Sequence, residues 1–251
     1  MRGPRGDDTR VRVVVCLPTY NERENLEPMV RALDDVVRRH DLDARVLVID
    51  DSSPDGTGKL ADRLTGEFRF LSVLHRERKD GLGPAYLAGF VWALATDADR
   101  IVEMDCDFSH DPQDLPRIVG ATQDADLALG SRYVDGGGTR NWGLGRRIVS
   151  RFGSFYARAI LDVGIRDLTG GFKCFRRTVL EEIGLERITT KGYAFQIETT
   201  YRALRAGARV VEVPILFAER EAGRSKMSRG IALEAMTKVP ELRVRALLNR
   251  L

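Results

Sequence analysis

The sequence lacks the cysteine pattern of a disulfide-stabilised or zinc-binding protein. It contains only three cysteines, Cys16, Cys106 and Cys174, which lie in unrelated segments and form no CxxC pair. An odd number of isolated cysteines argues against a disulfide framework and against a zinc knuckle. The three histidines are likewise not spaced as metal ligands. We therefore expect reduced, buried thiols.

Long apolar runs are also missing. The longest uncharged stretch, residues 81–96, is shorter than the ~20 residues that a helix needs to cross a bilayer, and it contains glycine and proline. Residues 1–10 are polar and lack the apolar core of a secretory signal. The sequence thus predicts no transmembrane helix, a disordered N-terminal tail over residues 1–10, and a product that stays in the cytoplasm.

An excess of charge of one sign is absent as well. Lysine and arginine total 40 against 37 aspartates and glutamates, which gives a net charge of +3. So small an excess produces no global positive field and argues against a nucleic-acid partner, so any anion site must be local. Hydrophobic residues make up 43% of the chain and charged residues 31%, which fits a folded domain and excludes a disordered or fibrous polymer.

Strand and helix patterns alternate through the first half of the chain. Continuous β-branched runs are typical of strands that are covered on both faces. Between them, apolar residues recur at helical spacing, with Asn25 as the expected N-cap of the first helix. This order predicts an α/β fold with a mostly parallel, doubly wound sheet flanked by helices. The expected strands are residues 11–17, 45–50, 71–76, 101–104 and 125–130, and the expected helices are 26–37, 57–68 and 86–95.

The pattern changes after Gly130, where a glycine-rich stretch begins. The segment DLTGGFKCFRR is expected to be a loop, and no internal repeat or low-complexity linker is present. We therefore expect residues 11–251 to form a single domain. The elements expected in its second half are helices at 146–161 and about 195–206, a strand at 210–217, and a closing amphipathic helix at about 231–248.

Three polar loops directly follow predicted strands: PTYNE, DDSSPDG and DCDFSHDP. In an open α/β sheet, ligands bind outside the carboxyl ends of the strands. We therefore expect these loops to converge on one edge of the sheet and to form a binding site there.

Asp105 and Asp107 place two carboxylates one residue apart in the third of these loops. Mg²⁺ prefers one or two carboxylates together with substrate phosphates and water, so an Asp-x-Asp turn suits a metal-diphosphate site. Aspartates are also common in ordinary surface turns, because they bond nearby backbone amides. The position of this pair in a convergent loop favours the metal site.

Asp50 and Asp51 stand at the mouth of the second strand, where a carboxylate can bind ribose hydroxyls or a base edge. The alternative is a turn that caps the helix beginning at Thr57. No GxGxxG follows the first strand, so a nicotinamide or flavin site lacks its phosphate-binding element. A sugar-nucleotide pyrophosphorylase is disfavoured on similar grounds, because it needs a glycine-rich basic loop at that position.

Several basic residues come from predicted loops rather than from helix faces. Arginine offers a planar fork that matches phosphate oxygens, and the amides near Gly170 and Gly171 provide further donors. A solvated basic surface is the alternative, and we favour it for Arg176 and Arg177. The candidate phosphate ligands are Arg132, Lys173, Arg220, Arg224 and Lys226.

Taken in order, PTYNE, IDDSSPDGT, MDCDFSHDP, GSRY, DLTGGFKCFRR, GYAFQIE and RSKMS resemble the motifs of a known enzyme family. The chain resembles the dolichol-phosphate mannose synthases, inverting family 2 glycosyltransferases with the GT-A fold, over roughly residues 11–231. The resemblance implies a nucleotide-sugar half at 11–130 and an acceptor half at 131–251 that includes the closing amphipathic helix.

The resemblance also implies residue roles on the donor side. Two departures from the family pattern are Cys106, where alanine is usual, and Ser109, where some members have glutamine; both leave the metal preference open. The guanosine of GDP-mannose is assigned to Pro18, Tyr20, Glu22, Ile49 and Asp51, the diphosphate to Asp105, Cys106 and Asp107, and Mg²⁺ or Mn²⁺ to Asp105, Asp107 and Ser109.

The resemblance further implies that Arg220 and Lys226 close over the donor phosphates. The family grips the lipid phosphate at the positions of Arg132, Arg146 and Ser150. The residues expected to act in catalysis are Asp105, Asp107, Arg132, Arg220 and Lys226, and Asp105 is also expected to support the oxocarbenium-like centre.

The implied reaction is transfer of mannose from GDP-mannose to a polyprenyl phosphate with inversion, giving polyprenyl-phosphate-mannose and GDP. Two alternatives stay open. UDP-glucose-dependent relatives share the same loops, and a catalytically silent nucleotide-sugar-binding subunit would share the fold. Retention of both carboxylates of the Asp-x-Asp turn argues against the silent subunit.

A lipid acceptor requires contact with a membrane surface. The helix expected at 146–161 and the closing helix both carry apolar and basic residues that suit an interface, although such stripes are also common in cores. Family members without membrane spans work beside an integral membrane protein. The resemblance therefore implies a peripheral protein on the cytosolic face of a membrane, with an integral membrane partner.

Overall fold

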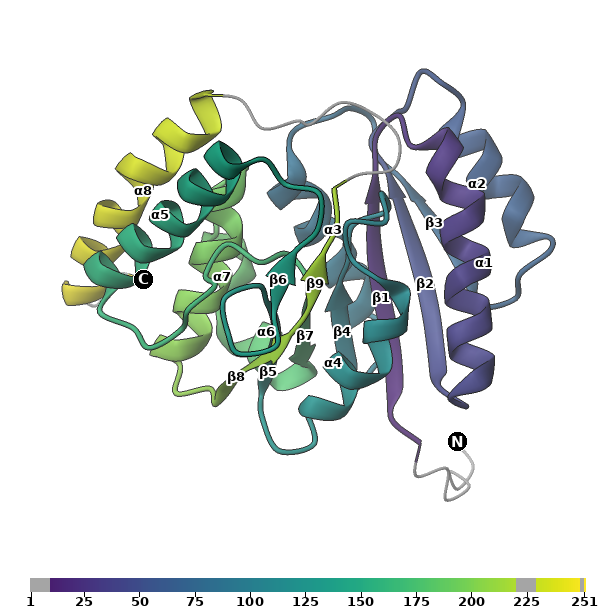
Figure 1. The fold of residues 1–251 in the computed structure, drawn as a ribbon. Helices are drawn as coiled ribbons and strands as arrows, with labels where there is room; N and C mark the ends of the chain where they lie inside the picture. Colours follow the sequence, from purple (N-terminus) through teal and green to yellow (C-terminus); the bar gives the residue numbers. More distant parts are fainter. Residues whose placement is uncertain (1–9, 220–228, 249–250) are drawn as a thin grey trace.

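A seven-stranded sheet runs through the centre of the computed structural model, which describes residues 10–219, 229–248 and 251 (Figure 1). Its strand order is β3-β2-β1-β4-β7-β5-β8, and a separate two-stranded sheet pairs β6 with β9. The strands are β1 (Arg12–Thr19), β2 (Asp43–Asp50), β3 (Leu71–His75), β4 (Arg100–Glu103), β5 (Leu127–Ser131), β6 (Gly138–Thr139), β7 (Lys173–Arg176), β8 (Val210–Pro214) and β9 (Leu216–Phe217).

The strands β1 to β4 run parallel to one another, and β5 runs parallel to β8. Between these groups, β7 pairs antiparallel with both β4 and β5. Two antiparallel steps restore the direction, so β5 points the same way as β4. The carboxyl ends of β1, β2, β4 and β5 therefore meet at one edge of the sheet, which confirms the mostly parallel fold expected from the sequence.

The strand β7 corrects the expectation that DLTGGFKCFRR forms a loop throughout. Lys173 at its start is fully buried, and the Arg176 side chain at its end donates to the backbone carbonyls of Thr122, Gln123 and Ala125. Both charged ends of this short strand are thus satisfied inside the protein. A strand with a charged residue at each end is stable here because tertiary partners satisfy the polar groups of both side chains.

Helices cover both faces of the sheet. Apolar residues of α1, α2 and α4 pack against one face, and those of α3, α6 and α7 pack against the other. The helices are α1 (Arg23–Arg39), α2 (Thr57–Thr65), α3 (Leu82–Leu94), α4 (Leu115–Ala121), α5 (Leu144–Leu161), α6 (Arg177–Glu182), α7 (Tyr193–Arg205) and α8 (Arg229–Leu247), with the 3-10 turns η1 (Pro112–Asp114) and η2 (Leu185–Arg187).

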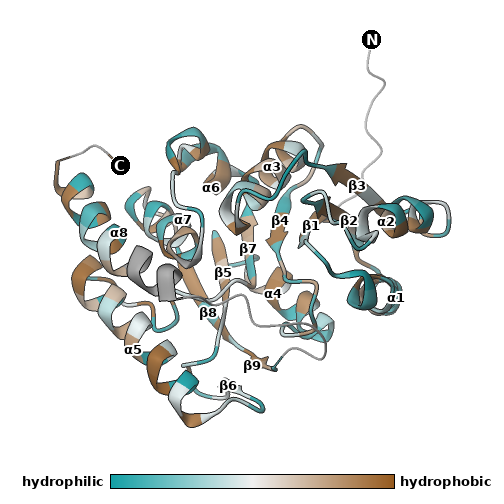
Figure 2. Cartoon of the chain, turned by 90° about the horizontal axis from the view of Figure 1, so that it is seen from above, coloured by the Kyte–Doolittle hydropathy of each residue, from teal (hydrophilic) through white to brown (hydrophobic). Residues whose placement is uncertain are grey.

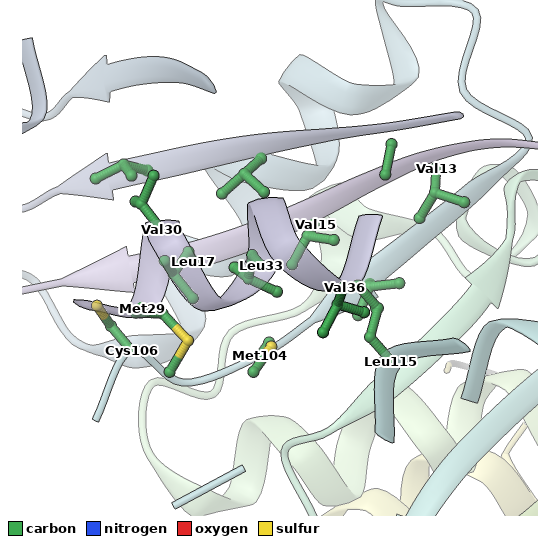
Figure 3. Packing of buried hydrophobic residues seen from close by; sticks show 14 of the residues in the cluster. Val13, Val15, Leu17, Met29, Val30, Leu33, Val36, Met104, Cys106 and Leu115 are labelled. Atoms are coloured by element: carbon green, nitrogen blue, oxygen red, sulfur yellow. The ribbon is translucent and has the colours of Figure 1, made fainter. Parts of the chain in front are cut away.

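The alternation of side chains along β1 divides the core into these two layers. Val13, Val15 and Leu17 face the first layer, where Met29 and Leu33 of α1 lie against them (Figure 3). Val14 and Cys16 point to the other face, into the layer that contains α3. The period of two expected for a strand thus explains why nearly every residue of β1 is apolar.

Helices α5 and α8 form an outer layer beyond α7. A third core cluster joins Ala157 and Leu161 of α5 to Tyr201 of α7 and to Val239 and Leu242 of α8. The two helices lie next to each other at the edge of the molecule, and hydrophobic segments mark the surface of α5 (Figure 2). Among the described residues, no helix is long and apolar enough to cross a membrane.

The predicted elements agree with the structure to within a few residues, with two corrections in addition to β7. Helix α1 begins at Arg23, so Asn25 is not its N-cap; Asn25 is buried in the first turn and donates to the Glu22 carboxylate. The strand expected at 210–217 is split at Ile215, and its second part pairs with β6 instead of the main sheet. Residues 1–9 of the predicted tail lie outside the described residues.

Candidate active site

The polar loops predicted to converge do follow neighbouring strands. Thr19 at the end of β1 pairs in register with Asp50 at the end of β2, and Cys16 pairs with Glu103 at the end of β4. The loops that begin at Tyr20, Asp51 and Met104 therefore leave the sheet side by side. Their backbones are tied as well, since Asp51 N donates to Thr19 O and Met104 N donates to Cys16 O.

The loop after β1 presents a ring and a carboxylate. Pro18 and Tyr20 are partly exposed, and the Lys79 Nζ lies 4.0 Å from the centroid of the Tyr20 ring. Glu22 is buried, where its carboxylate accepts from Asn25 and its backbone N–H donates to Thr57. Glu22 thus joins α1 to the start of α2 and holds the loop in place.

The loop after β2 contributes Asp51, a buried carboxylate whose Oδ1 accepts from Arg76 at 2.6 Å. Burial raises the pKa of Asp51, and the positive charge of Arg76 opposes that rise. Ile49, also predicted to contact the nucleotide, is fully buried and packs in the core below this loop with Cys16. The structure therefore leaves Pro18 and Tyr20 partly exposed at the candidate nucleotide site, with Asp51 buried beside them and Ile49 in the core beneath.

The loop after β4 holds the paired carboxylates in a tight turn. Phe108 adopts a left-handed φ of 59°, which is rare for a residue with a large side chain and marks a functional or strained turn. Asp107 is buried and accepts from the backbone N–H of Ser109 at 3.1 Å. Asp105 accepts from the Tyr86 hydroxyl of α3 at 3.3 Å. Both carboxylates are thus positioned before any ligand binds.

His110 supports this turn from behind. Its Nδ1 accepts from Asp105 N at 3.1 Å, and its ring packs against Phe172 and Phe217, with centroids 5.1 and 5.3 Å away. Burial lowers the pKa of His110, which favours the neutral ring that the accepting Nδ1 requires. His110 therefore has a structural role in the turn.

The donor atoms of the turn fit a hard divalent cation. Asp105 and Asp107 supply carboxylate oxygens, and the nearby Ser109 Oγ is buried without a hydrogen-bond partner in the described part of the chain. No group of three or more acidic, histidine or cysteine side chains suited to a metal occurs in residues 10–219 and 229–248. A cation here would complete its shell with phosphate oxygens and water, as Mg²⁺ does.

Cys106 lies between the two carboxylates but points away from them. Its thiol is buried in the core cluster with Met29 of α1 (Figure 3). A small apolar side chain is therefore what this position requires, which explains how cysteine replaces the alanine expected from the resemblance. Any contact of Cys106 with a diphosphate would involve its backbone.

Arg132, at the end of β5, is held in a buried ion pair. Its Nε and Nη2 donate to the two carboxylate oxygens of Asp167 at 2.7 Å each, and Nη2 also donates to Thr169. Burial alone would raise the pKa of Asp167, but the charge and hydrogen bonds of Arg132 outweigh it and lower that pKa. The rings of Trp142 and Phe217 face the guanidinium.

Arg146 and Ser150, on the first turns of α5, lie near Arg132. The guanidinium of Arg146 stacks over the same Trp142 ring at 4.2 Å, and it pairs with Glu219. Ser150 accepts from the hydroxyl of Tyr133, the residue after Arg132. The structure thus brings together the three residues predicted to bind a lipid phosphate.

Lys173 does not join this group. Its Nζ is fully buried and donates to the backbone and side-chain oxygens of Gln196 and to Thr199. The expectation that Lys173 binds phosphate from a loop is therefore wrong, because the residue begins a central strand. Arg220, Arg224 and Lys226 lie outside the described residues, and their predicted contacts with phosphate stay predictions.

Sequence reasoning missed the partners that orient these residues. Asp167 lies 35 positions from Arg132, so only the fold shows that they pair. Trp142, a tryptophan in a glycine-rich loop between arginines, was the one available sign of an aromatic support for the basic group. Tyr86, deep in α3, gave no sign of its hydrogen bond to Asp105.

Comparison with known proteins gives consistent matches. Residues 14–184 match the model of the family described as glycosyl transferase family 2. The chain is 48% identical over 229 residues to an undecaprenyl-phosphate mannosyltransferase of Micrococcus luteus, with 91% of this chain and 93% of that protein aligned. It is 49% identical over 241 residues to a polyprenol monophosphomannose synthase of Mycolicibacterium smegmatis, covering 95% and 89%.

The fold also resembles that of a solved enzyme. Glucosyl-3-phosphoglycerate synthase from Mycobacterium tuberculosis, in complex with Mn²⁺, UDP-glucose and glycerol 3-phosphate, superposes with a TM-score of 0.61. The alignment covers 96% of this chain and 80% of that chain at 21% identity. At this level of identity the match concerns the fold alone.

Proposed function

This chain belongs to glycosyl transferase family 2, and we propose that it transfers mannose from GDP-mannose to a polyprenyl phosphate with inversion. The observation that carries the proposal is its identity of 48% and 49%, over most of its length, with two relatives named for mannose transfer to this class of lipid. The fold is of the GT-A type, an α/β sheet whose strands end at the site just described.

On the donor side, Asp105 and Asp107 would hold Mg²⁺ or Mn²⁺ against the diphosphate of GDP-mannose. When bound, such a cation neutralises the negative charge that develops on the departing diphosphate. The resident hydrogen bonds from Tyr86 and from the Ser109 N–H keep the two carboxylates oriented for this role. Pro18, Tyr20 and Asp51 would receive the guanosine at the neighbouring strand ends.

On the acceptor side, an oxygen of the lipid phosphate would attack the anomeric carbon of mannose. The new bond joins that carbon to the acceptor oxygen, while the bond to the β-phosphate oxygen breaks and GDP leaves with the electron pair. A phosphate monoester is already largely dianionic near neutrality, since its second pKa is about 6, so no strong general base is needed. Arg132, Arg146 and Ser150 would position it.

We further propose that α5 brings the site to a membrane surface. Five large apolar residues of this helix are strongly exposed, from 54% for Val149 to 73% for Leu144. Arg147, Arg151 and Arg158 form an exposed row beside them, as helical spacing requires. An apolar face bordered by arginines fits the interface of an anionic bilayer. The apolar residues are Leu144, Ile148, Val149, Phe152 and Phe155.

This placement suits the chemistry, because Arg146 and Ser150 belong to the same helix as the apolar face. A polyprenyl phosphate keeps its chain in the bilayer and its phosphate at the surface, so α5 would meet both parts. A peripheral position on the cytosolic face and an integral membrane partner remain further parts of the proposal.

The test is transfer of radiolabelled sugar into organic-extractable lipid by the purified protein, with Mg²⁺ or Mn²⁺ and polyprenyl phosphate in vesicles. GDP-mannose, UDP-glucose and UDP-N-acetylglucosamine are compared as donors. We expect label from GDP-mannose alone. Label from UDP-glucose alone would show that the transferred sugar is glucose, and the proposed site would stay the same.

A catalytically silent subunit is the remaining alternative, and the retained carboxylate turn argues against it. If Asp107→Ala abolishes transfer while the melting temperature is kept, the chain is the catalyst. If the purified protein binds nucleotide sugar but transfers nothing in vesicles, even with a membrane extract added, the enzyme proposal fails.

A further inference from the structure

After β8 the chain leaves the main sheet and forms a short strand elsewhere. β8 ends at Pro214, and β9 lies side by side with β6 in the two-stranded sheet (Figure 1). The crossing is fixed at both ends, because Ile215 N donates to Ser131 O and Arg140 N donates to Phe217 O. The two residues of β9 are therefore held in place although they add nothing to the main sheet.

Phe217 of β9 contacts three groups that come from three different segments. Its ring meets the His110 ring edge to face, with centroids 5.3 Å apart, and it meets the Trp142 ring in the same way at 5.3 Å. The guanidinium carbon of Arg132 lies 5.3 Å from the Phe217 centroid. Edge-to-face ring pairs and a guanidinium over a ring are both favourable arrangements. One half-buried side chain thus fixes the relative positions of three others.

On one side, Phe217 is connected to the carboxylate turn. His110 is 1% exposed, and its Nδ1 accepts from Asp105 N within that turn. A second link runs through the backbone, because Ala218 N donates to Ser109 O at 3.2 Å. The turn proposed to hold the cation and the donor diphosphate is therefore joined to β9 by two separate contacts.

On the other side, Phe217 is connected to the residues proposed to position the acceptor phosphate. Trp142 is 7% exposed, and the Arg146 guanidinium lies 4.2 Å from its ring centroid. Arg132 faces both the Trp142 ring and the Phe217 ring. Arg146 also pairs with Glu219, two residues after Phe217, at 3.2 Å. β9 and the two residues that follow it thus contact both basic groups of the acceptor side.

The proposed reaction makes strict demands on the distance between these two sides. The carboxylate turn follows β4 and Arg132 follows β5, and β7 separates these two strands in the main sheet. In a direct displacement the reacting atoms must approach to about 3–3.5 Å, and a misplacement of about 1 Å can cost about 100-fold in rate. A rigid contact between the two sides, outside the sheet, would keep that distance constant.

We infer that Phe217 is a positioning residue, which sets the distance between the carboxylate turn on the donor side and the arginines on the acceptor side. It acts on the turn through His110 and on the acceptor side through Trp142 and Arg132. The inference rests on the proposed function, since it needs a donor and an acceptor at these two places. It also explains the break after β8, because leaving the main sheet carries the Phe217 ring between the two sides.

The first test replaces the ring by a smaller apolar side chain, in Phe217→Leu. Phe70→Leu is the matched control, because Phe70 is also half-buried and meets Phe68 edge to face at 6.0 Å, but it lies before β3, at the end of that strand away from the site. Leu216→Ala is a second control in β9 itself, since that side chain is 53% exposed. The measurements are kcat, the KM for polyprenyl phosphate, the calorimetric affinity for GDP with Mn²⁺, and the melting temperature.

For Phe217→Leu we expect kcat to fall by about 10–100-fold, because the two sides are no longer held at one distance. The GDP affinity and the KM for polyprenyl phosphate should change by no more than about threefold, since each side keeps its own ligands. Both controls should keep kcat, even where Phe70→Leu lowers the melting temperature as much as Phe217→Leu does. An unchanged kcat in Phe217→Leu, or a GDP affinity that falls by the same factor as kcat, would overturn the inference.

The second test asks whether the two rings act as one chain of contacts. The variants Phe217→Leu and Trp142→Leu are combined, and kcat is compared with that of each single variant. The double variant should lose no more kcat than the more damaged single variant, because breaking either contact already disconnects the two sides. Losses that multiply would show that the rings act independently and would refute the inference. A wild type that transfers no mannose would refute the proposed function itself, whereas an active wild type with a fully active Phe217→Leu would refute this inference alone.

Discussion

Helices α1 and α5 have nearly the same length but opposite outer faces. Helix α1 buries Leu26, Met29 and Leu33 against the sheet, and its outer face carries arginine–carboxylate pairs one turn apart, such as Arg31 with Glu27 and Arg38 with Asp34. Helix α5 buries only Ser154, Ala157 and Leu161 and turns its large apolar residues outward. The outer face of α1 is therefore suited to contact with water, whereas the outer face of α5 is suited to contact with an apolar surface.

The charged side chains near the site also differ between the α1 side and the α5 side. Near α1 the strand ends present carboxylates, Asp51 and Asp107, which suit a cation and nucleotide hydroxyls. Near α5, Arg132 after β5 and Arg146 on α5 itself present guanidinium groups that face Trp142 and suit a phosphate. Under the proposed function, the donor and the acceptor would thus bind at different positions along one sheet edge.

The largest effect is expected on stability, from Asp167→Asn. The change leaves the buried Arg132 charge without its counterion, which costs about 3–5 kcal/mol of the free energy of unfolding. Asp34→Asn, in the exposed pair on α1, is the matched control and should cost no more than about 0.5 kcal/mol. Urea unfolding measures both. Similar costs for the two variants would show that the sides do not differ as described.

The same pair predicts a pH dependence. Because Arg132 lowers the pKa of Asp167 in the folded state, the pair contributes stability above the ordinary pKa of an unfolded aspartate, about 3.9. That contribution is lost as the pH falls through the lower folded pKa. The stability gap between wild type and Asp167→Asn should therefore be constant near neutrality and narrow below about pH 4. A difference in stability between wild type and Asp167→Asn that increases as the pH falls would contradict the predicted direction of the effect.

The next largest effect is expected on the α1 side, from Asp107→Asn. Loss of a carboxylate from the turn should lower mannose transfer by about 10²–10³-fold, because the charge on the departing diphosphate is less well balanced. Asp111→Asn is the control, since Asp111 caps η1 through its side chain and asparagine caps equally well. Initial rates at saturating Mn²⁺ measure both. A loss in the control as large as in Asp107→Asn would indicate damage to the loop instead.

Most of the order of strands and helices could be predicted from the sequence because buried parallel strands are continuous apolar runs, but the short helices α4 and α6 were not expected. The carboxylate turn could be predicted for a related reason, since Asp105 and Asp107 directly follow such a run. β7 could not, because it is four residues long with a charged residue at each end, and Lys173 is satisfied by Gln196 and Thr199, 23 and 26 positions away. Long-range pairing of polar side chains is decided by the fold.

The apolar face of α5 is a second feature that could not be assigned from the sequence alone. The spacing of Ile148, Val149, Phe152 and Phe155 fits a buried stripe as well as a membrane interface, and the sequence left both open. The structure places Ala157 and Leu161 against the core and these larger residues outside. Packing, which periodicity does not contain, decides which stripe of a helix is buried.

A moderate effect is expected on membrane binding, from Phe152→Ala combined with Phe155→Ala. Each ring should contribute about 1–1.5 kcal/mol when it enters the interface, so partition onto vesicles falls roughly 100-fold for the pair. Stability should hardly change, because the rings are 64% and 65% exposed. Val91→Ala, an exposed apolar residue of α3, is the control. Sedimentation with vesicles of phosphatidylglycerol and phosphatidylcholine measures partition; unchanged binding would exclude α5 as the contact.

The smallest effect is expected from the charges that border this face. Arg151→Gln and Arg158→Gln each remove an exposed positive charge from α5, which should weaken binding to the same anionic vesicles by about 1 kcal/mol, or roughly fivefold. The effect should fade as salt is raised, because the surface potential is screened within a Debye length of about 10 Å at 0.1 M salt. Arg38→Gln on α1 is the control, since its partner Asp34 already balances its charge. An equal loss of vesicle binding in Arg38→Gln and Arg151→Gln would mean that the whole protein is attracted to the surface. A loss of binding that is confined to the α5 variants and abolished by salt would show that the side of the protein carrying α5 faces the bilayer.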